Sequence, residues 1–261
     1  QSSNLIIART IFSMGVPVSP KNVFPSNIEG LPTWFSIRLS PDGYQCRTDD
    51  VDVLVALNPT TWQRDIQGVN EGAAVIHEAT YPVVGNMKRS DVHYYAVPFH
   101  KLGQESVDNP DLRKYLTNMI YVGTVAWLLG IPIETVEKSL AQQFAKKPKV
   151  IPSNMRMVQI GHDYMGTTHQ KHDAYAVEPM KGRTEGKILI EGNEALALGA
   201  VMGGCTVAAW YPITPSSSVC ENLDALANRY RVDPQTGEKR IAVIQAEDEL
   251  ASIGMVIGAA W

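Results

Sequence analysis

The chain has 261 residues, enough for one large or two ordinary domains. Its composition is globular, with 44% apolar residues, 19% charged residues and a formal net charge of −4, and it has no basic cluster of the kind that binds nucleic acid. No apolar run reaches the length of a membrane span. The first apolar stretch contains Arg9 and lacks the layout of a secretory signal, so we expect a cytoplasmic protein without nucleic-acid or membrane partners.

The cysteine pattern limits the metal chemistry open to the chain. Cys46, Cys205 and Cys220 are scattered, and no two of them form a Cys-x-x-Cys pair. An odd, dispersed set is typical of a reducing compartment, where we expect buried, free thiols. These cysteines cannot by themselves supply the ligands of an iron–sulfur cluster or a zinc site.

Residues 1–150 alternate between helix-like and strand-like patterns, which predicts an open α/β domain. The continuous apolar run at 51–57 is typical of a central parallel strand, and Gly130 is expected to end a long helix. The predicted elements are a helix over 4–14, a loop over 16–32, a hairpin of 34–40 with 44–47, strands over 51–57, 73–77 and 93–98, a short helix near 60–68, and helices over 112–130 and 133–146 that cover the sheet.

Residues 151–185 are predicted to connect two domains. The segment has no strand period and contains His162, His169 and His172. A metal cluster formed with neighbouring aspartates is an alternative, but the histidine spacing matches no ligand template. We therefore interpret the segment as a polar connector without a metal site.

Residues 186–261 predict the beginning of a second α/β domain. The pattern stops within a helix at Trp261, and the first helix of the chain has no strand before it, so we expect a piece of a longer polypeptide. Glycine costs about 1 kcal/mol inside a helix, so the glycine-rich helices are expected to lie close against neighbours. The predicted elements are a small-residue helix over 192–204, a strand over 206–210, a helix over 219–230, a polar turn over 232–239, a strand over 241–245 and a small-residue helix over 248–261.

The turn Tyr211-Pro212-Ile213-Thr214-Pro215-Ser216-Ser217 follows the first of these two strands. A strand, a hydroxyl-rich turn and a helix in this order form ligand sites at the carboxyl edge of α/β sheets. Thr214 precedes a proline and is restricted to extended geometry, so its hydroxyl is expected to be held in place; the alternative is a turn hydroxyl bonded to its own backbone. Ser216 or Ser217 is expected to cap the following helix.

A second turn, Glu247-Asp248-Glu249, follows the other strand. Acidic residues gain about 0.3–1 kcal/mol at a helix N-terminus, and Asp248 needs no role beyond the N-cap. The functional interpretation is a carboxylate held over a cofactor in a poorly solvated site. Thiamine diphosphate needs such a glutamate, because its hydrogen bond to the aminopyrimidine ring favours loss of the thiazolium proton. Burial would raise the pKa of the carboxyl group and favour proton sharing.

Three segments resemble, in order and spacing, the α subunit of the 2-oxoacid:ferredoxin oxidoreductases, thiamine-dependent enzymes that convert 2-oxoacids to acyl-CoA. They are Gly192-Asn193-Glu194-Ala195 with Gly199-Ala200, the turn 211–217, and Glu247-Asp248-Glu249 followed by Gly254 and Gly258-Ala259. Residues 25–34 and 52–59 resemble the γ domain of the same family. The order γ before α is similar to the fused large subunit of 2-oxoglutarate-type members. The implied fold is a γ-type open α/β domain followed by the first part of a pyrimidine-type thiamine-diphosphate-binding α/β domain.

The resemblance also implies roles for particular residues. Glu249, favoured by the spacing Glu-x4-Gly-x3-Gly-Ala, matches the family glutamate that contacts the aminopyrimidine. Thr214 matches the threonine that approaches the thiazolium and the substrate, so these two are the expected catalytic residues. Tyr211, Pro212 and Ile213 are expected to bind the cofactor with them. No metal ligand is expected in this chain.

The partners follow from the same resemblance. In the family a β subunit carries the [4Fe-4S] cluster and the motif that holds the diphosphate and Mg²⁺, and the assembly is (αβ)2. Electrons pass through the cluster to ferredoxin, and coenzyme A takes the acyl group on a side that the γ domain helps to cover. We find no acidic diphosphate motif in this chain, so we expect it to be inactive without its partner.

The expected substrate is 2-oxoglutarate, because of the fused order. A pyruvate or branched-chain 2-oxoacid member of the family is an alternative. A nucleotide-dependent dehydrogenase and a non-catalytic α/β interaction module are the alternatives outside it. A long acidic substrate would need a cation, for which Arg38, Lys181 and Arg183 are available.

Overall fold

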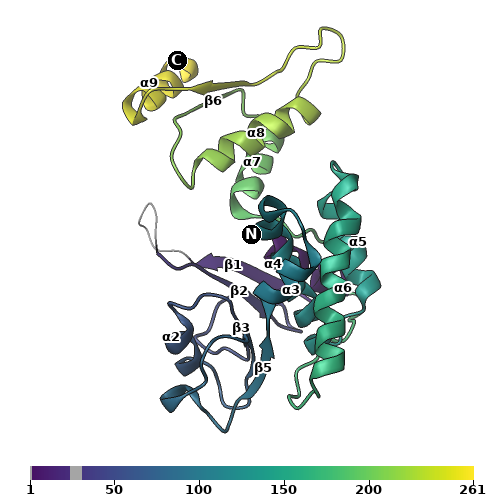
Figure 1. Ribbon diagram of the computed structural model, residues 1–261. Coiled ribbons are helices and arrows are strands. Elements are labelled where there is room, and N and C mark those ends of the chain that lie inside the picture. The colour runs from purple at the N-terminus through teal and green to yellow at the C-terminus, as the bar shows by residue number, and fades with distance from the viewer. Residues whose placement is uncertain (1, 24–30) are drawn as a thin grey trace. The chain divides into compact units, whose positions relative to one another are not determined.

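The computed structural model describes residues 2–23 and 31–261 (Figure 1). The chain forms two compact units, residues up to 187 and residues 188–261. Both units combine helices and strands, as the sequence predicts. Residues 25–30, part of the segment that resembles the γ domain, lie outside the described residues.

A three-stranded parallel sheet is the centre of the first unit. Its strands are β3 (Val53–Ala56), β4 (Ala74–Glu78) and β5 (His93–Val97), in that order across the sheet. Successive side chains of a strand point to opposite faces. Residues 74 and 76 of β4 therefore join one buried cluster, and residue 75 joins another that includes helix α2 (Trp62–Gln67). The three strands confirm the sequence prediction.

An antiparallel ribbon precedes this sheet. It pairs β1 (Val18–Val23) with β2 (Trp34–Leu39). The loop predicted over 16–32 is therefore wrong for β1. Its Pro20 is compatible with a strand because each strand of a two-stranded ribbon has one unpaired edge.

The hairpin predicted for 34–40 with 44–47 has the wrong partner strand. Its turn does form, since the Gly43 N–H donates to the Ser40 carbonyl over 3.1 Å and Gly43 has a φ of 80°. Residues 44–47 then continue as an exposed irregular segment instead of a return strand. A turn signal thus identified the end of β2 but not the strand with which β2 pairs.

Helices pack around the sheet of the first unit, but α5, which was predicted to cover it, packs mainly against α1. Helix α4 ends as predicted, because Gly130 adopts the left-handed φ of 67° that favours glycine, but it begins two residues before the predicted start, where the Asn109 side chain accepts from the Asp111 N–H. Helix α3 was not predicted, since its sequence is short and mostly polar. The helices are α1 (Ser2–Ser13), α2, α3 (Phe99–Ser106), α4 (Pro110–Leu129), α5 (Ile133–Gln143) and α6 (Ile151–Thr168), with short 3-10 turns η1 (Gly85–Met87) and η2 (Pro148–Val150).

Helix α6 lies in the segment interpreted as a connector. Its residues Met157, Val158 and Met165 are buried, and the helix packs mainly against α4. Polar side chains between these residues weaken the helical period, so the sequence did not reveal it. The chain after α6 also stays on the first unit, because the Val177 N–H donates to the Leu129 carbonyl over 2.8 Å.

Two glycines allow α4 and α6 to approach closely. A Cβ added at Gly123 would lie 1.9 Å from the carbonyl oxygen of Val158. A Cβ added at Gly161 would lie 2.0 Å from the carbonyl oxygen of Ile120. Because both obstacles are backbone atoms of helices, they cannot move aside easily, and only glycine fits at either position.

A buried polar network ties the chain after α6 to β5. The hydroxyl of Tyr95, which is 1% exposed, donates to Asp173 Oδ2 over 2.5 Å and accepts from the His172 N–H. Asp173 Oδ1 accepts from Lys171 Nζ over 2.5 Å. Burial favours a higher pKa for Asp173, but the hydrogen bonds from Lys171 and Tyr95 outweigh it, and the pKa lies below its ordinary value. Asp173 is therefore an ionised, fully paired anchor.

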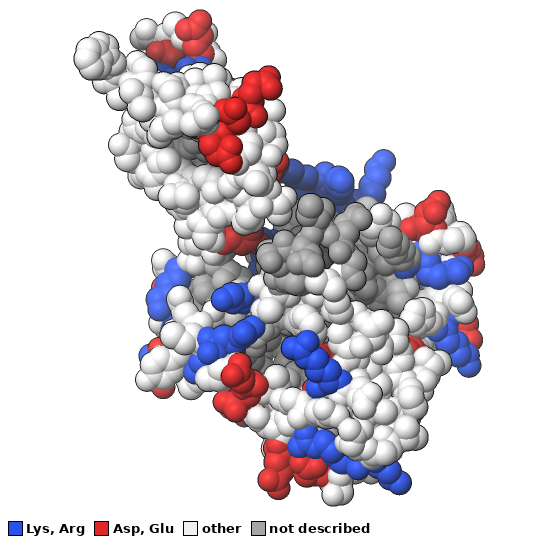
Figure 2. All heavy atoms as spheres, turned by 90° about the vertical axis from the view of Figure 1, so that its left-hand side faces the viewer, with Lys and Arg blue, Asp and Glu red and all other residues white. Residues whose placement is uncertain are grey.

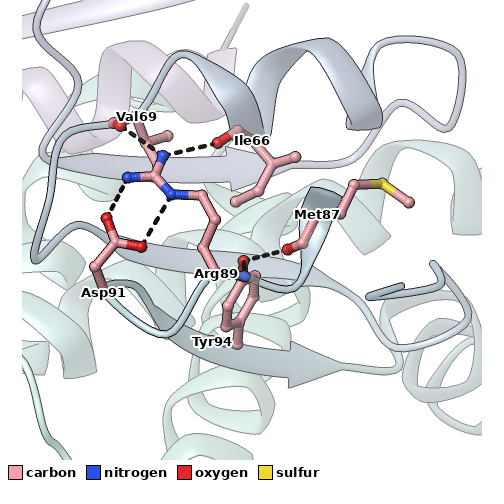
Figure 3. A network of polar contacts seen from close by, with 6 residues as sticks. All are labelled: Ile66, Val69, Met87, Arg89, Asp91 and Tyr94. Carbon is pink, nitrogen blue, oxygen red and sulfur yellow. Dashed lines mark hydrogen bonds and ion pairs between the residues drawn. The ribbon is translucent and has the colours of Figure 1, made fainter. Parts of the chain in front are cut away.

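Arg89 fixes the connection between β4 and β5 (Figure 3). Its Nη1 donates to the carbonyls of Ile66 and Val69, at and just beyond the end of α2, over 3.2 and 2.8 Å. The same guanidinium pairs with Asp91 through Nε and Nη2. The Arg89 side chain thus satisfies backbone carbonyls at the end of α2 and holds the loop that contains Asp91 against that helix.

The second unit contains a parallel two-stranded sheet and three helices within residues 188–261. Its core is formed by α7 and α8 against the strands and consists of Ala197, Val201, Leu223, Ala227 and Ile241. The elements are α7 (Gly192–Met202), β6 (Val207–Trp210), α8 (Ser217–Tyr230), β7 (Ala242–Gln245) and α9 (Glu249–Ala260). All five confirm predicted elements.

Close packing of the glycine-rich helices is only partly observed. Ala197 of α7 is fully buried. In α9, by contrast, a Cβ added at Gly254 or Gly258 meets no described atom within 4 Å, and Leu250 and Ile257 are exposed. The prediction of close neighbours for the small residues of α9 is therefore not met within the described residues.

The predicted polar turn between α8 and β7 is closed on itself. Val232 and Lys239 form an isolated antiparallel bridge. Arg240 Nη2 pairs with Asp233 Oδ2 over 2.7 Å, and this pair with two backbone N–H bonds lowers the pKa of Asp233 to about 2. The turn lies at the amino end of β7, away from the edge at which that strand ends.

The surface agrees with the balanced composition in the view of Figure 2, where basic and acidic side chains occur in small separate groups. Cys46 is exposed, so the prediction of buried thiols is wrong for this residue, which lies in the irregular segment after β2. Cys205 and Cys220 are partly buried, and burial raises the pKa of Cys220. Within residues 2–23 and 31–261, no helix has both the length and the apolar character needed to cross a membrane.

The glycine contact between α4 and α6 gives a stability prediction. Gly123→Ala and Gly161→Ala should each lower the free energy of unfolding by about 1–3 kcal/mol, because an added methyl group forces the helix backbones apart. Gly254→Ala is the matched control in α9, where the added methyl meets open space and improved helix propensity should raise stability by up to about 1 kcal/mol. Urea unfolding followed by circular dichroism measures all three; equal effects at Gly123 and Gly254 would contradict the contact.

The Tyr95–Asp173 network gives a pH-dependent prediction. Tyr95→Phe should destabilise the first unit by about 1.5–3 kcal/mol at neutral pH, because a buried, charged acceptor loses a donor. Because the pKa of Asp173 is lowered in the folded state, its contribution is present above the unfolded value and is lost as the pH falls below about 4. The difference between wild type and variant should therefore shrink in acid. Tyr115→Phe, at a residue that is 70% exposed, is the control.

Candidate functional site

The two predicted turns of the second unit leave the same edge of its sheet. β6 and β7 run parallel, with Trp210 opposite Gln245, and the Ala246 N–H donates to the Trp210 carbonyl over 2.6 Å. Tyr211 and the acidic turn that ends in Glu249 therefore begin side by side at the carboxyl edge. This is the arrangement in which open α/β sheets bind ligands.

Hydrogen bonds to Ile213 give the first turn its shape. The Ile213 carbonyl accepts from the Ser217 N–H over 3.0 Å and from Ser216 Oγ over 2.9 Å. The Ser217 hydroxyl in turn accepts from the Ile213 N–H over 3.0 Å. Ser216 occupies the N-cap position of α8 without bonding the helix N–H groups, so the predicted serine cap is wrong. Both hydroxyls are used to close the turn instead.

Asn193 attaches this turn to the start of α7. Its Nδ2 donates to the Pro215 carbonyl over 2.9 Å and to Ser218 Oγ over 2.7 Å. Asn193 belongs to a sequence motif that does not by itself indicate a role for it. The two hydrogen bonds explain why an amide is useful there: one NH₂ group donates to both.

Thr214 lies at the exposed tip of the turn, and its peptide bond to Pro215 is cis. Among the described residues its hydroxyl has no hydrogen-bond partner, in contrast to the hydroxyls of Ser216 and Ser217. The alternative of a hydroxyl bonded to its own backbone is thus not what the structure contains. Thr214 is available to a ligand.

Glu249 is the first residue of α9 and is exposed. Its Oε1 accepts a hydrogen bond from the Tyr211 hydroxyl, and this bond lowers the pKa of Glu249 and raises that of Tyr211. Sequence reasoning considered burial, which would raise the pKa of the carboxyl group. In this structure the hydrogen bond from Tyr211, just after β6, has the larger effect on the pKa, and Glu249 is an ionised carboxylate at neutral pH.

Asp248 has the capping role predicted for it, since its Oδ1 accepts from the Ala251 N–H over 2.7 Å. The cap fixes where α9 begins. Glu249 is therefore held in the first turn of the helix, where the N–H dipoles favour a negative charge.

Tyr211 and Glu249 line a hollow of about 320 Å³. The sequence did not predict the other side chains around it, which come from β6, the start of α8 and the first two turns of α9; they are Ala209, Trp210, Ser216, Ser252, Ile253 and Val256. Pro212, Ile213 and Thr214 are exposed beside the hollow and do not line it. The site thus combines a largely apolar wall with one carboxylate.

Two histidines of the predicted connector have separate polar partners. His169 Nε2 lies 2.9 Å from the Ala96 carbonyl, and His162 Nδ1 lies 3.7 Å from Asp163. His169 and His172 also line a polar hollow of about 460 Å³ with His93. Among the described residues no three His, Cys, Asp or Glu side chains are grouped so as to hold a metal ion.

The fold and this edge site define a class: an α/β protein with a carboxylate-bearing ligand site at the carboxyl edge of parallel strands. Two family models match the chain. Residues 1–164 match the model described as pyruvate ferredoxin/flavodoxin oxidoreductase, and residues 198–261 match the thiamine-diphosphate-binding model of the pyruvate flavodoxin/ferredoxin oxidoreductases. The chain therefore belongs to the pyruvate ferredoxin/flavodoxin oxidoreductase family.

Individual relatives agree with this family. The chain is 27% identical to the α subunit of 2-oxoacid:ferredoxin oxidoreductase 2 from Aeropyrum pernix, over 100% of this chain and 47% of that protein. It is 27% identical to the 2-oxoglutarate oxidoreductase subunit KorA of Mycobacterium tuberculosis, over 87% of this chain and 37% of that protein. The chain thus spans less than half the length of these curated relatives.

A solved structure shares the fold. It is the 2-oxoglutarate:ferredoxin oxidoreductase from Magnetococcus marinus with 2-oxoglutarate, coenzyme A and succinyl-CoA bound. The TM-score is 0.79 at 27% identity, and the match covers 99% of this chain and 43% of that chain. The expected fold, a γ-type unit followed by the first part of a thiamine-diphosphate-binding unit, is confirmed.

The link from Asn193 to the turn gives a local prediction. Asn193→Ala should loosen the turn by about 1 kcal/mol and speed amide exchange at Ile213 and Ser217 roughly fivefold, because two hydrogen bonds to the turn are lost. Asn228→Ala removes an exposed amide whose bond stays within α8, to Asp224, and should leave those two amides unchanged. Hydrogen exchange followed by NMR measures both variants. Unchanged exchange in Asn193→Ala would show that the turn is held by its serines alone.

Proposed function

We propose that this chain is part of a subunit of a 2-oxoacid:ferredoxin oxidoreductase and that its second unit contributes the aminopyrimidine side of a thiamine diphosphate site. The observation that carries the proposal is the Glu249 carboxylate at the apolar hollow beside Tyr211, in the segment that matches the thiamine-diphosphate-binding family model. The family relatives with oxidoreductase names support the reaction class.

The side chains of the hollow fit an aromatic ring that carries nitrogen atoms. Trp210, Ile253 and Val256 offer an apolar wall, and Glu249 offers a single charged acceptor. An aminopyrimidine ring needs both, because its faces are apolar and its ring nitrogen pairs with a carboxylate. The part of the chain that the structure describes contributes no basic side chain to the lining of the hollow, so the hollow suits the ring end of the coenzyme better than the diphosphate.

Bound thiamine diphosphate would supply the carbon nucleophile that adds to the carbonyl group of a 2-oxoacid. In this proposal Glu249 shares a proton between its carboxylate and the ring nitrogen of the coenzyme. The exposed Thr214 hydroxyl, which has no described hydrogen-bond partner, is free to contact the reacting carbonyl or carboxylate of the substrate. We assign these two residues the catalytic roles, and Tyr211, Pro212 and Ile213 the binding of the coenzyme.

A second subunit completes the site in this proposal. It holds the diphosphate and Mg²⁺ and carries the [4Fe-4S] cluster that passes electrons to ferredoxin, in an (αβ)2 assembly. The three cysteines of the chain are scattered in the sequence, which supports ligation of the cluster by another subunit in this proposal. Coenzyme A accepts the acyl group.

We propose 2-oxoglutarate as the substrate. The names of the Mycobacterium tuberculosis relative and of the solved Magnetococcus marinus enzyme support this choice over pyruvate. Of the cations considered from the sequence, Arg38 donates to the Cys46 carbonyl and Arg183 lies 3.9 Å from Asp42. Both contacts are within the first unit, and we assign neither residue to the substrate.

Glu249→Gln tests the proposal. In the complex of the full subunit with its partner, 2-oxoglutarate-dependent reduction of a dye should fall by about 10²–10⁴-fold, because a group that transfers protons is lost. Glu247→Gln is the matched control, since it removes an exposed carboxylate from the same turn. It should retain activity.

Three outcomes would contradict the assignment. Unchanged activity in Glu249→Gln, with assembly intact by size-exclusion chromatography, would reject Glu249 as the catalytic carboxylate. Equal losses in both variants would indicate a general effect of charge. Turnover by the chain without a partner would reject the division of the site between two subunits.

A further inference from the structure

We propose that Tyr211 is a positioning residue for Glu249: its hydroxyl holds Oε1 of the carboxylate and leaves Oε2 for the ring nitrogen of the coenzyme. This inference rests on the proposed function of the site. In this proposal Tyr211 does more than line the hollow. It sets the orientation and the proton affinity of the catalytic carboxylate.

The geometry places both partners on rigid elements. Tyr211 is the first residue after β6, and Glu249 is the first residue of α9, whose start is fixed by the Asp248 cap. The pairing of β6 with β7 sets the two backbones side by side, and α9 packs against β6. The hydrogen bond from the Tyr211 hydroxyl therefore restricts a glutamate side chain that is otherwise exposed and free to rotate.

Among the described residues, Tyr211 supplies the side-chain hydrogen bond to the carboxylate. The described hydrogen bonds give Oε1 the Tyr211 hydroxyl and give Oε2 no side-chain partner. An ionised carboxylate accepts hydrogen bonds at both oxygens. Tyr211 and Glu249 both line the hollow. The Oε2 atom of Glu249 is therefore the acceptor available to a ring that binds there.

Among the charged and titratable groups around Glu249, Tyr211 has the largest effect on the pKa of its carboxyl group. The neighbours are Tyr211, from the turn after β6, and Asp248 and Glu247, from the turn before α9. Asp248 raises the pKa of Glu249, whereas the Tyr211 hydroxyl and the backbone N–H at the helix start lower it. Within the described residues no lysine or arginine forms an ion pair with Glu249, so Tyr211 is its principal side-chain donor.

The proton balance gives a measurable consequence. Glu249 is ionised before the coenzyme binds, so the proton shared with the ring nitrogen comes from solvent. Coenzyme binding should then take up protons and weaken as the pH rises. Tyr211→Phe removes the main donor to the carboxylate, so the pKa of Glu249 and the whole pH profile of coenzyme affinity should move to higher pH.

The first experiment needs no coenzyme. The chain is labelled with ¹³C at glutamate side chains, and Glu249→Gln assigns the Glu249 signal. Tyr211→Phe should raise the pH midpoint of that signal, whereas Tyr230→Phe, at an exposed tyrosine that stacks on Arg229, should not. Equal midpoints in wild type and Tyr211→Phe would overturn the inference.

The second experiment measures thiamine diphosphate and Mg²⁺ binding to the full subunit in complex with its partner. Calorimetry in buffers of different ionisation enthalpy reports proton uptake across the pH range. We expect uptake in wild type, its loss in Glu249→Gln, and a profile displaced to higher pH in Tyr211→Phe but not in Tyr230→Phe.

The outcomes separate the two proposals. If wild type does not bind thiamine diphosphate, the proposed function fails and the inference fails with it. If wild type binds with proton uptake and Tyr211→Phe leaves the profile in place, the function stands and the positioning role is overturned. If Tyr211→Phe and Tyr230→Phe displace the profile equally, the effect is not specific to Glu249, and the inference is also overturned.

Discussion

The parallel pairing of β6 with β7 is the constraint on which the second unit depends. The two strands are separated by more than thirty residues of chain, yet Trp210 lies opposite Gln245 and both strands end together. Parallel strands require a crossover, and α8 provides it. Because the turns after the strands begin at one edge, a tyrosine and a glutamate distant in sequence share a hydrogen bond.

Much of this arrangement could be predicted from the sequence. The apolar runs before Tyr211 and Glu247 identify two strands, although the structure leaves β7 largely exposed, and the turn residues after them identify the edge where a ligand site is predicted. The Asp248 cap and the Gly130 helix end were also predictable, because each depends on a residue and its immediate neighbours. Such a feature depends only on nearby residues, so it can be predicted without knowing which distant elements come into contact.

Features that depend on the detailed course of a turn or on contacts between distant elements were not predictable. The hydroxyls of Ser216 and Ser217 had a plausible partner in the helix N–H groups, but the turn geometry gives them Ile213 instead. The exposure of Glu249, and the donor that lowers its pKa, depend on the register of β6 against β7. The partner of β2 was missed for a similar reason, because a turn signal does not say which strand returns.

The first unit shows that polar composition does not define a linker. The histidine-bearing segment after residue 150 looked like a connector, but α6 within it lies against α4 through backbone contact at Gly123 and Gly161. The helical period is carried by a few buried side chains, and the glycines that make the contact possible contribute no apolar signal. Tyr95 and Asp173 then hold the chain beyond α6 on the same unit.

The closed turn between α8 and β7 has a consequence for evolution and for engineering. Its bridge between Val232 and Lys239 and its Arg240–Asp233 pair close it at the amino end of β7, and Lys239 also pairs with Asp224 of α8. The Tyr211 and Glu249 turns occupy the carboxyl ends of the strands. Length changes or a fluorescent label near Gln235–Gly237 can therefore be accommodated on the opposite edge of the sheet, which makes this turn a place to report on the unit without altering its chemistry.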